Sequence, residues 1–265
     1  MASEIAGVAL AAGAGTRLSP ITDVIAKPLC EVATIPLLDL AVARLGTVGA
    51  EVAVNAHHHH EDLQAHLGTS VHISHEVDEA LGTAGAIGRL REWIDGRATV
   101  IVNADTWCPG PLDALLEGWD NERVRVMVPG GGTFGPSSAV VGTLLPWRVV
   151  RELADTPSGL FEMVWRSEQQ DGLLEVVDHA GVWVDCGTPA ELHRANMFAL
   201  AGRSVVHPDA RVSGLVQQTA VSAGVSVAGE ANESVLLRGS LVAAGESVSR
   251  VIRWRSTTGQ QTIQL

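Results

Sequence analysis

The opening of the chain constrains its fold more than any other stretch. An apolar run over residues 5–12 leads directly into Gly13-Ala14-Gly15-Thr16-Arg17. A short apolar run that ends in glycines predicts a buried parallel strand followed by a loop. Glycines leave backbone N–H groups open to an anion, and Arg17 can bind phosphate oxygens in a bidentate manner. We therefore predict a phosphate-binding loop here, although the same turn also suits an ordinary strand-to-loop connection.

Lys27 is a second unusual charged residue in this region. Lys27 is the only lysine of the 265 residues, and every other fixed cation is an arginine. It stands ten residues after Arg17 and directly before Pro28, which favours an extended backbone at Lys27. An ammonium group is a compact point charge, unlike the planar guanidinium group. We predict that Lys27 acts on a bound phosphate; the alternative is a surface charge at a turn.

Strands and helices alternate along the first 200 residues. Further strands are predicted over 52–55, 71–74, 99–103 and 124–128, and helices over 35–45, 61–67, 85–94 and 112–119. Strands joined by helices of this length pair in parallel. The predicted fold is therefore α/β, with a doubly wound, mostly parallel, Rossmann-like sheet.

Composition excludes several classes of partner. The net charge is −12, and residues 1–202 hold 26 acidic against 12 basic side chains. An acidic body without a basic stripe predicts no nucleic-acid partner. No apolar run is long enough to span a membrane, so no membrane partner is predicted. Three widely spaced cysteines predict thiols in a reducing, cytoplasmic location.

Two carboxylates follow buried strands. Asp105 comes after the apolar run 100–102, and Asp185 follows Trp183-Val184. Each is compatible with a turn residue, but together at the carboxyl ends of two strands they can hold Mg²⁺ against a triphosphate. The run His57–His60 is interpreted as a solvated loop, because four consecutive side chains diverge and cannot meet on one ion.

A glycine-containing helix start lies between these features. The stretch Leu81-Gly82-Thr83-Ala84-Gly85 follows a polar loop that contains Glu76. Backbone N–H groups at such a helix start can face an anion or the edge of a base. Taken alone, the stretch also fits a helix capped by Thr83.

These motifs, in this order, resemble the sugar-1-phosphate nucleotidyltransferases, which include the glucose-1-phosphate, mannose-1-phosphate and N-acetylmuramate-1-phosphate enzymes. The resemblance rests on LAAGAGTRL, Lys27-Pro28, LGTAG, and the pattern Trp-Val-Asp-x-Gly-Thr-Pro at residues 183–189. It implies transfer of a nucleotidyl group from a nucleoside triphosphate to a sugar-1-phosphate, with Mg²⁺ and release of pyrophosphate. The implied catalytic residues are Arg17, Lys27 and Asp105; the nucleotide-binding residues are Leu10, Ala11, Ala12, Gly13, Gly15, Thr16, Glu76, Gly82 and Thr83; the sugar-binding residues are Gly142 and Glu162; and the metal ligands are Asp105 and Asp185.

From residue 203 the pattern of apolar residues in the sequence changes. Apolar residues recur at a spacing of six, as in Val206 and Val212 or Val221 and Val227. This spacing predicts coils of a left-handed parallel β-helix, with an antiparallel hairpin domain as the alternative. We therefore predict a nucleotidyltransferase catalytic domain over 1–202 and a β-helical tail over 203–265. A short stack of coils exposes its terminal coil, which another surface must cover. We therefore predict a homo-oligomer formed through the tail.

Departures from the family pattern keep other functions open. Ala104 replaces a glycine, no second lysine is present for the sugar phosphate, and the turn-rich stretch 129–136 is shorter than in many relatives. Arg166 or Lys27 would have to bind the sugar phosphate. One alternative is a catalytically silent subunit that binds a sugar nucleotide and regulates a partner. Another is nucleotidyl transfer to a non-sugar phosphate such as phosphocholine.

Overall fold

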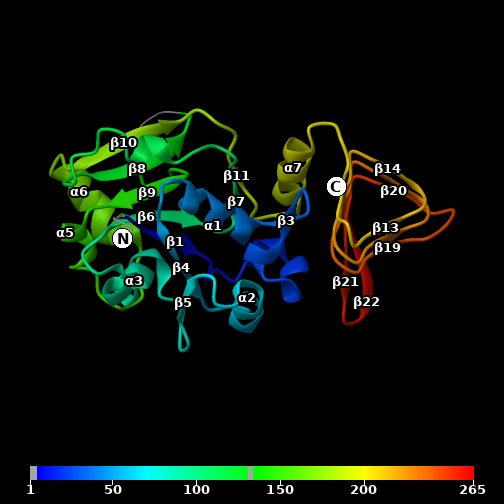
Figure 1. The fold of residues 1–265 in the computed structure, drawn as a ribbon, viewed down its shortest axis with the longest axis horizontal. Helices are drawn as coiled ribbons and strands as arrows, with labels where there is room; N and C mark the ends of the chain where they lie inside the picture. Colours follow the sequence, from blue (N-terminus) through cyan, green and yellow to red (C-terminus); the bar gives the residue numbers. More distant parts are fainter. Residues whose placement is uncertain (1–4, 131–133) are drawn as a thin grey trace. The chain divides into compact units, whose positions relative to one another are not determined.

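The computed structural model describes residues 5–130 and 134–265, which form two compact units. Unit 1 takes in the described residues of Met1–Ala14 and Leu38–Trp183, and unit 2 takes in Gly15–Leu37 and Val184–Leu265. Figure 1 follows the chain from blue to red and labels its elements. Part of the predicted turn-rich stretch, residues 131–133, lies outside the described residues. The domain boundary at residue 202 stays a prediction.

Unit 1 is built on a seven-stranded sheet. Its order is β10-β8-β9-β6-β1-β4-β5. All neighbouring strands for which a register is defined pair in parallel except those that involve β9, which is antiparallel to β6 and β8. The predicted parallel-rich α/β sheet is therefore confirmed. The strands are β1 (Ile5–Leu10), β4 (Glu51–Ala56), β5 (His72–His75), β6 (Ala98–Asn103), β8 (Val124–Pro129), β9 (Gly142–Leu145) and β10 (Leu174–His179).

The first strand lies in the middle of this sheet, between β4 and β6. Ala6, Val8 and Ala9 have no exposed surface, as expected of a strand that is covered on both faces. Its carboxyl end therefore lies at the edge where loops gather in parallel sheets. The remaining elements of unit 1 are α1 (Leu37–Thr47), α2 (His60–Leu67), α3 (Gly82–Arg89), α4 (Arg91–Ile94), β7 (Thr106–Trp107), η4 (Asp113–Leu115), α5 (Trp147–Val150), the π-helical turn η5 (Phe161–Trp165) and α6 (Arg166–Gln170).

The predicted helix over 112–119 is wrong. Only a short 3-10 turn, η4, forms there, and Gly118 takes a left-handed conformation. The guanidinium group of Arg125, which lies buried in β8, donates to the carbonyls of Leu115, Glu117 and Gly118. Those carbonyls are therefore satisfied by a side chain instead of by the next helical turn.

Unit 2 begins with short turns and ends in strands. Its helix α7 (Pro189–Leu200) starts at Thr188, whose hydroxyl accepts a hydrogen bond from the N–H of Glu191. Asn196, fully buried on α7, donates to the carbonyl of Glu31 and accepts from the N–H of Ala33. The other elements before the tail are η1 (Thr16–Leu18), η2 (Ile21–Asp23), η3 (Lys27–Leu29), β2 (Glu31–Val32), β3 (Ile35–Pro36) and β11 (Val184–Asp185).

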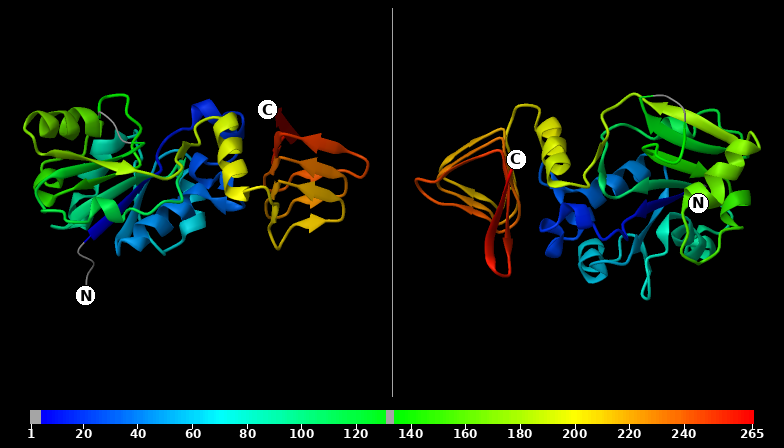
Figure 2. Two further views of the ribbon diagram at one scale, coloured as in Figure 1. Left: turned by 90° about the horizontal axis from the view of Figure 1, so that it is seen from above. Right: turned by 180° about the vertical axis from the view of Figure 1, so that it is seen from behind.

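The tail consists of short strands stacked in three parallel ladders (Figure 2). Register partners are 15 to 17 residues apart, so each turn of the chain adds one strand to each ladder. Only the last hairpin, β21–β22, is antiparallel. The ladders are β12 (Val205–Val206), β15 (Ala220–Val221), β18 (Val235–Leu236), β21 (Val251–Ser256) and β22 (Gly259–Gln264); β13 (Arg211–Val212), β16 (Ser226–Val227) and β19 (Leu241–Val242); and β14 (Leu215–Gln217), β17 (Glu230–Asn232) and β20 (Ser247–Ser249).

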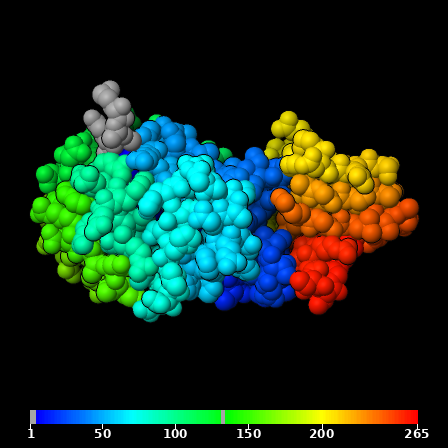
Figure 3. All heavy atoms as spheres, turned by 60° about the horizontal axis from the view of Figure 1, so that its bottom comes forward, coloured from blue at the N-terminus to red at the C-terminus, as the bar shows by residue number. Residues whose placement is uncertain are grey.

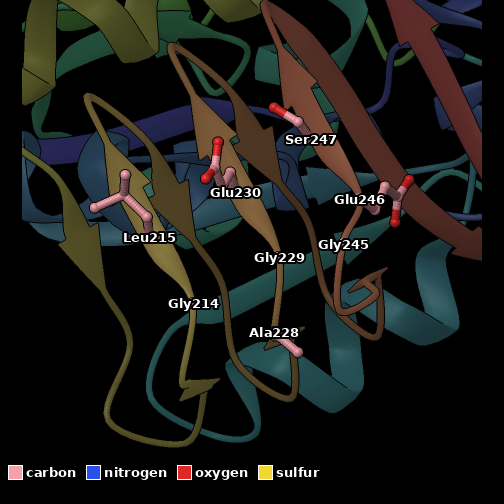
Figure 4. A pocket seen from close by; sticks show the side chains of 8 residues that line it. All are labelled: Gly214, Leu215, Ala228, Gly229, Glu230, Gly245, Glu246 and Ser247. Atoms are coloured by element: carbon pink, nitrogen blue, oxygen red, sulfur yellow. The ribbon is translucent and has the colours of Figure 1, made fainter.

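Small residues and backbone pack closely at one corner of these coils. A hollow is lined there by Gly214, Leu215, Ala228, Gly229, Glu230, Gly245, Glu246 and Ser247 (Figure 4). A Cβ on Gly214 or Gly229 would collide with a backbone carbonyl of the following coil. The Glu246 carboxylate accepts from Arg253 and from the N–H of Ala243. The corner is therefore held by structural contacts between successive coils.

The first coil exposes side chains that its successors bury. Val206 and Val212 are 42% and 36% exposed, whereas their register partners Val221 and Val227 are fully buried. Leu215 in the same coil is 52% exposed. Figure 3 shows an outer face of this stack, coloured yellow to red. We call Val206, Val212 and Leu215 the first-coil apolar set.

None of the helices in the described part of the chain has the length and apolar character that a membrane crossing requires.

Candidate active site

A pocket of about 250 Å³ opens at the carboxyl ends of the central strands of unit 1. Leu10 and Asn103 end β1 and β6, and Asn55 lies next to the end of β4. This edge is where parallel α/β sheets bind ligands. The structure thus brings together six of the predicted site residues. The lining is Leu10, Ala12, Gly13, Asn55, Ala80, Gly82, Thr83, Asn103 and Asp105.

A buried hydrogen-bond network joins the two loops of this pocket. The Asn55 carbonyl oxygen accepts from the N–H of Ala11 at 2.7 Å, and its amide donates to Glu76 at 2.7 Å. The other Glu76 oxygen accepts from the N–H of Leu81 at 2.7 Å. Glu76 is only 2% exposed and does not line the pocket. Glu76 therefore positions the two loops, and its part in nucleotide binding stays a prediction.

Glu76→Gln is expected to raise the dissociation constant of a bound nucleoside triphosphate about tenfold and to lower the Tm by a few degrees. Glutamine keeps the shape of the side chain but presents one NH₂ group, which must face either Asn55 or the N–H of Leu81. Both of those groups are donors, so one buried pair is left unsatisfied. Calorimetric titration with the nucleotide and a thermal melt measure the two effects.

The matched control for this variant is Glu79→Gln, since Glu79 is an exposed carboxylate of the same loop. It removes the same charge without touching the network. Equal affinity and equal Tm in Glu76→Gln and the control would show that the network does not shape the pocket.

Unit 2 gathers three charged side chains of the predicted site. Asp185 lies 3.2 Å from a guanidinium nitrogen of Arg17 and 3.6 Å from the Nζ of Lys27. Lys27 is 7% exposed, so the alternative of a surface charge is wrong. The predicted extended backbone at Lys27 also differs from the structure, because the N–H of Cys30 bonds to the Lys27 carbonyl and closes the 3-10 turn η3.

Two glycines leave room for this arrangement. Gly15 has a φ of 65°, and a Cβ there would lie 2.9 Å from the Cβ of Lys27. A Cβ on Gly187 would lie 2.7 Å from Arg17 and 2.9 Å from the Asp185 carboxylate. Glycine at these positions therefore allows the cations and the carboxylate to approach one another. Thr16 is exposed at the start of η1.

The three cysteines form no crosslink, and Cys30 is not a nucleophile. No disulfide joins any pair of cysteines in the described residues. Burial, and next the neighbouring Cys186, raise the pKa of Cys30 to about 12. The Cys30 thiol is therefore neutral, which makes it a poor nucleophile.

Metal-binding chemistry rests on carboxylates. Within residues 5–130 and 134–265, no group of three or more His, Cys, Asp or Glu side chains is placed to hold a metal ion. The His57–His60 run accordingly forms no such site. Mg²⁺ is commonly held by one or two carboxylates together with substrate phosphates. The hard oxygen donor that Asp105 supplies to the pocket lining fits that chemistry.

The two predicted sugar-binding residues lie apart from the pocket lining. Gly142 begins β9, where a Cβ would lie 3.2 and 3.3 Å from the side chains of Leu115 and Leu112. Glu162 is exposed in the π-helical turn η5. Turns of this kind often occur at functional sites. Ala104, which replaces a glycine of the family pattern, is fully buried and is not part of the pocket lining.

A parallel-rich sheet whose strand ends, glycine loop and carboxylate line one pocket defines a nucleotide-binding α/β protein. The family model described as Nucleotidyl transferase matches residues 6–132. An N-acetylmuramate alpha-1-phosphate uridylyltransferase from Caulobacter vibrioides is 30% identical over 219 residues, which are 68% of this chain and 90% of that protein. The chain belongs to the sugar-1-phosphate nucleotidyltransferase family.

Further similarities support the same fold. An N-acetylmuramate alpha-1-phosphate uridylyltransferase from Neisseria meningitidis is 28% identical over 73% of this chain and 96% of its own length. A mannose-1-phosphate guanylyltransferase catalytic subunit beta from Danio rerio is 24% identical over 69% of this chain and 61% of its own length. A Bacillus anthracis protein solved in complex with sucrose has a TM-score of 0.64 at 22% identity, over 74% of this chain and 95% of that protein.

Proposed function

We propose that the chain transfers a nucleotidyl group from a nucleoside triphosphate to a sugar-1-phosphate. A phosphate oxygen of the sugar attacks the α-phosphorus, the bond from that phosphorus to the bridging oxygen breaks, and pyrophosphate leaves. Little covalent chemistry is required of the protein, so catalysis comes from positioning and charge neutralisation. The family membership and the pocket of unit 1 support this proposal.

The cations of unit 2 supply the neutralising charge. Arg17, whose side chain is largely exposed, neutralises the triphosphate and the developing pyrophosphate. Lys27 places a compact charge between the attacking oxygen and the α-phosphate. Asp185 contacts both cations and thereby orients them. These roles use an arrangement that is already formed in unit 2.

We further propose Mg²⁺ as the cofactor, with Asp105 and Asp185 each supplying a carboxylate oxygen. When bound, a divalent ion would neutralise phosphate charge. The sequence Gly82-Thr83 presents its backbone to the base, and the glycine loop with Ala12 and Thr16 presents N–H groups to the phosphates. Ala11 lies next to them in this proposal, with its own N–H bonded to Asn55. Gly142 and Glu162 contact the sugar in this proposal. Arg166 or Lys27 binds the sugar phosphate.

The observation that carries the proposal is the pocket that gathers Leu10, Gly13, Gly82, Thr83 and Asp105. The test is pyrophosphate release with Mg²⁺ across a panel of nucleoside triphosphates and sugar-1-phosphates. We expect UTP with N-acetylmuramate α-1-phosphate to react, because two relatives matched over at least 90% of their lengths carry that activity in their names.

Other outcomes of the panel separate the alternatives. Turnover with phosphocholine alone would replace the sugar acceptor by a non-sugar phosphate. Binding of a sugar nucleotide without pyrophosphate release from any pair would indicate a regulatory subunit. The buried methyl group of Ala104 removes one reason for that second alternative, since it leaves the pocket unobstructed.

For the tail we propose a left-handed parallel β-helix that joins two copies of the chain. The three parallel ladders support the coil, and the first-coil apolar set supports an interface, because Val206 and Val212 occupy positions whose partners in the next coil are buried. Apolar side chains left at the end of a stack favour contact with another surface. We also propose that the protein is cytoplasmic and that the tail domain begins at residue 203.

Val212→Glu is expected to convert the oligomer into a monomer of 27.8 kDa, because a charge in the first-coil apolar set cannot be buried against a second copy. Light scattering after size-exclusion chromatography measures the mass. The control is Gln217→Glu, which adds the same charge at an exposed polar position of the same coil. An unchanged oligomeric mass in Val212→Glu would exclude this surface as the interface.

A further inference from the structure

The start of α3 packs directly on the backbone of residues 154–160, a segment that we call the strap. Three glycines of α3, spaced three apart, face it: a Cβ on Gly82, Gly85 or Gly88 would collide with the carbonyls of Ser158, Thr156 and Ala154, respectively. Such close approach of a helix to a backbone segment requires glycine. The helix that opens at the pocket is therefore fitted to the strap along its length.

Backbone hydrogen bonds fasten the strap to the residues at the pocket. The N–H of Ser158 donates to the carbonyl of Leu81 at 2.9 Å, and the N–H of Ala84 donates to the carbonyl of Ser158 at 2.9 Å. These two bonds flank Gly82 and Thr83, which line the pocket. The strap is thus hydrogen-bonded to the pocket rim on both sides of Gly82-Thr83.

One side chain makes the connection from the pocket to the end of the strap. The hydroxyl oxygen of Thr83 accepts a hydrogen bond of 2.8 Å from the N–H of Leu160. A hydroxyl that accepts one bond still has its own hydrogen to donate, and hydrogen bonds in such a chain strengthen one another. Thr83 can therefore donate to a molecule in the pocket while it holds Leu160.

Leu160 leads immediately into η5, the turn that carries Glu162. Leu160 and Val164 are each 2% exposed and belong to the core of unit 1, so η5 is anchored on both sides of Glu162. The first N–H groups of a helical turn have no hydrogen-bond partner within the turn. The N–H of Leu160 lies at this start of η5. Thr83 satisfies one of them and so fixes how η5 begins.

We propose that Thr83 is a positioning residue that couples nucleotide binding to the acceptor side through Leu160 and Glu162. This inference rests on the proposed function, in which Glu162 contacts the sugar. A nucleotide in the pocket fixes the Thr83 hydroxyl, the hydroxyl fixes the strap, and the strap sets the orientation of η5. Because coupling free energy is reciprocal, an acceptor bound at η5 then tightens the nucleotide by the same factor.

The test compares Thr83→Val, which keeps the shape but loses the hydroxyl, with Thr83→Ser, which keeps the hydroxyl. We expect Thr83→Val to raise the KM for the sugar-1-phosphate about tenfold, because the N–H of Leu160 loses its acceptor. The Kd for UTP with Mg²⁺ alone should rise by about threefold at most, since only one hydrogen bond to the nucleotide is lost and the backbone of Gly82-Thr83 remains, and Thr83→Ser should restore the acceptor KM. Thr83→Ala removes the same hydroxyl and replaces Thr83→Val if that variant does not fold.

Ser158→Ala is the matched control within the strap. It removes a side-chain bond to the Thr156 carbonyl but leaves the backbone bonds to Leu81 and Ala84 in place. Its acceptor KM should equal that of the wild type. A Thr83→Val variant with a raised Kd for UTP and an unchanged acceptor KM would overturn the inference and make Thr83 a nucleotide contact only.

A second measurement separates this inference from the proposed reaction. Hydrogen exchange is followed over residues 158–164, with and without UTP and Mg²⁺, in the wild type and in Thr83→Val. Protection on UTP addition in the wild type alone supports the coupling, even if no sugar-1-phosphate yields pyrophosphate. Equal exchange in both proteins, with UTP bound, contradicts it, whatever the acceptor proves to be.

Discussion

Lys27→Ala is expected to lower kcat by about 10²- to 10³-fold, the loss that follows removal of one preorganised electrostatic group. Lys27 is buried beside the Asp185 carboxylate, and Gly15 leaves the space that its stem occupies. An attacking phosphate oxygen and the α-phosphate repel each other unless a cation lies between them. A buried ammonium group held by a carboxylate meets that need without reorganisation during the reaction.

Lys27→Arg should also lose most of kcat, although it keeps the charge. The planar guanidinium group is larger than an ammonium group and does not fit a compact bridging position. Steady-state kinetics measure both variants, and Arg238→Ala, which removes an exposed cation of unit 2, is the control. A Lys27→Ala variant that keeps kcat and kcat/KM within a factor of about two would exclude the bridging role.

Much of the fold could be predicted because it depends on local periodicity. The apolar run that became β1 and the six-residue spacing of Val221 and Val227 both indicated burial on a regular element, whereas Val206 and Val212, with the same spacing, are exposed in the first coil. The strands of the tail pair in parallel with partners 15 to 17 residues apart, and the β-helix itself stays a prediction. Such patterns repeat many times along the chain, so the error at any one position matters little.

Long-range polar contacts could not be predicted in this way. Arg125 lies on β8 and donates hydrogen bonds to three carbonyls of the segment 112–119, where a helix was expected. Nothing in the local sequence of that segment indicates this pairing. Glu76 shows the same limit at the site. The resemblance placed it among the nucleotide-binding residues, but nothing in the local sequence indicated that its two oxygens accept hydrogen bonds from Asn55 and Leu81.

The pocket itself was predictable to the extent that strand ends identify one edge of the sheet. Leu10 ends a buried strand, and Gly13 and Asp105 follow buried strands, so the topology brings them together. Asn55 was not chosen, although a polar residue near the end of an apolar strand is a signal for it. The link between Thr83 and Leu160 joins residues 77 positions apart and required the structure.

Asp105→Asn is expected to abolish measurable turnover at ordinary Mg²⁺ concentrations while leaving the fold intact. Asparagine has the same shape as aspartate, so the lining of the pocket and the bond from the N–H of Ala104 to the Leu10 carbonyl are preserved. The variant loses only the negative charge and one anionic oxygen, which are the properties that a divalent cation requires of a ligand. The loss should therefore appear as a requirement for more Mg²⁺ and as a lower kcat.

A titration of Mg²⁺ against pyrophosphate release measures both effects, and chelation of the metal should stop the wild-type reaction. Asp113→Asn is the control, because Asp113 is an exposed residue of unit 1 outside the pocket lining. This substitution removes the same charge without changing the pocket. An unchanged melting temperature in Asp105→Asn separates loss of the ligand from loss of the fold. Wild-type activity of Asp105→Asn at ordinary Mg²⁺ would remove Asp105 from the site, since a carboxylate that holds the metal against the triphosphate cannot be replaced by a neutral amide without cost.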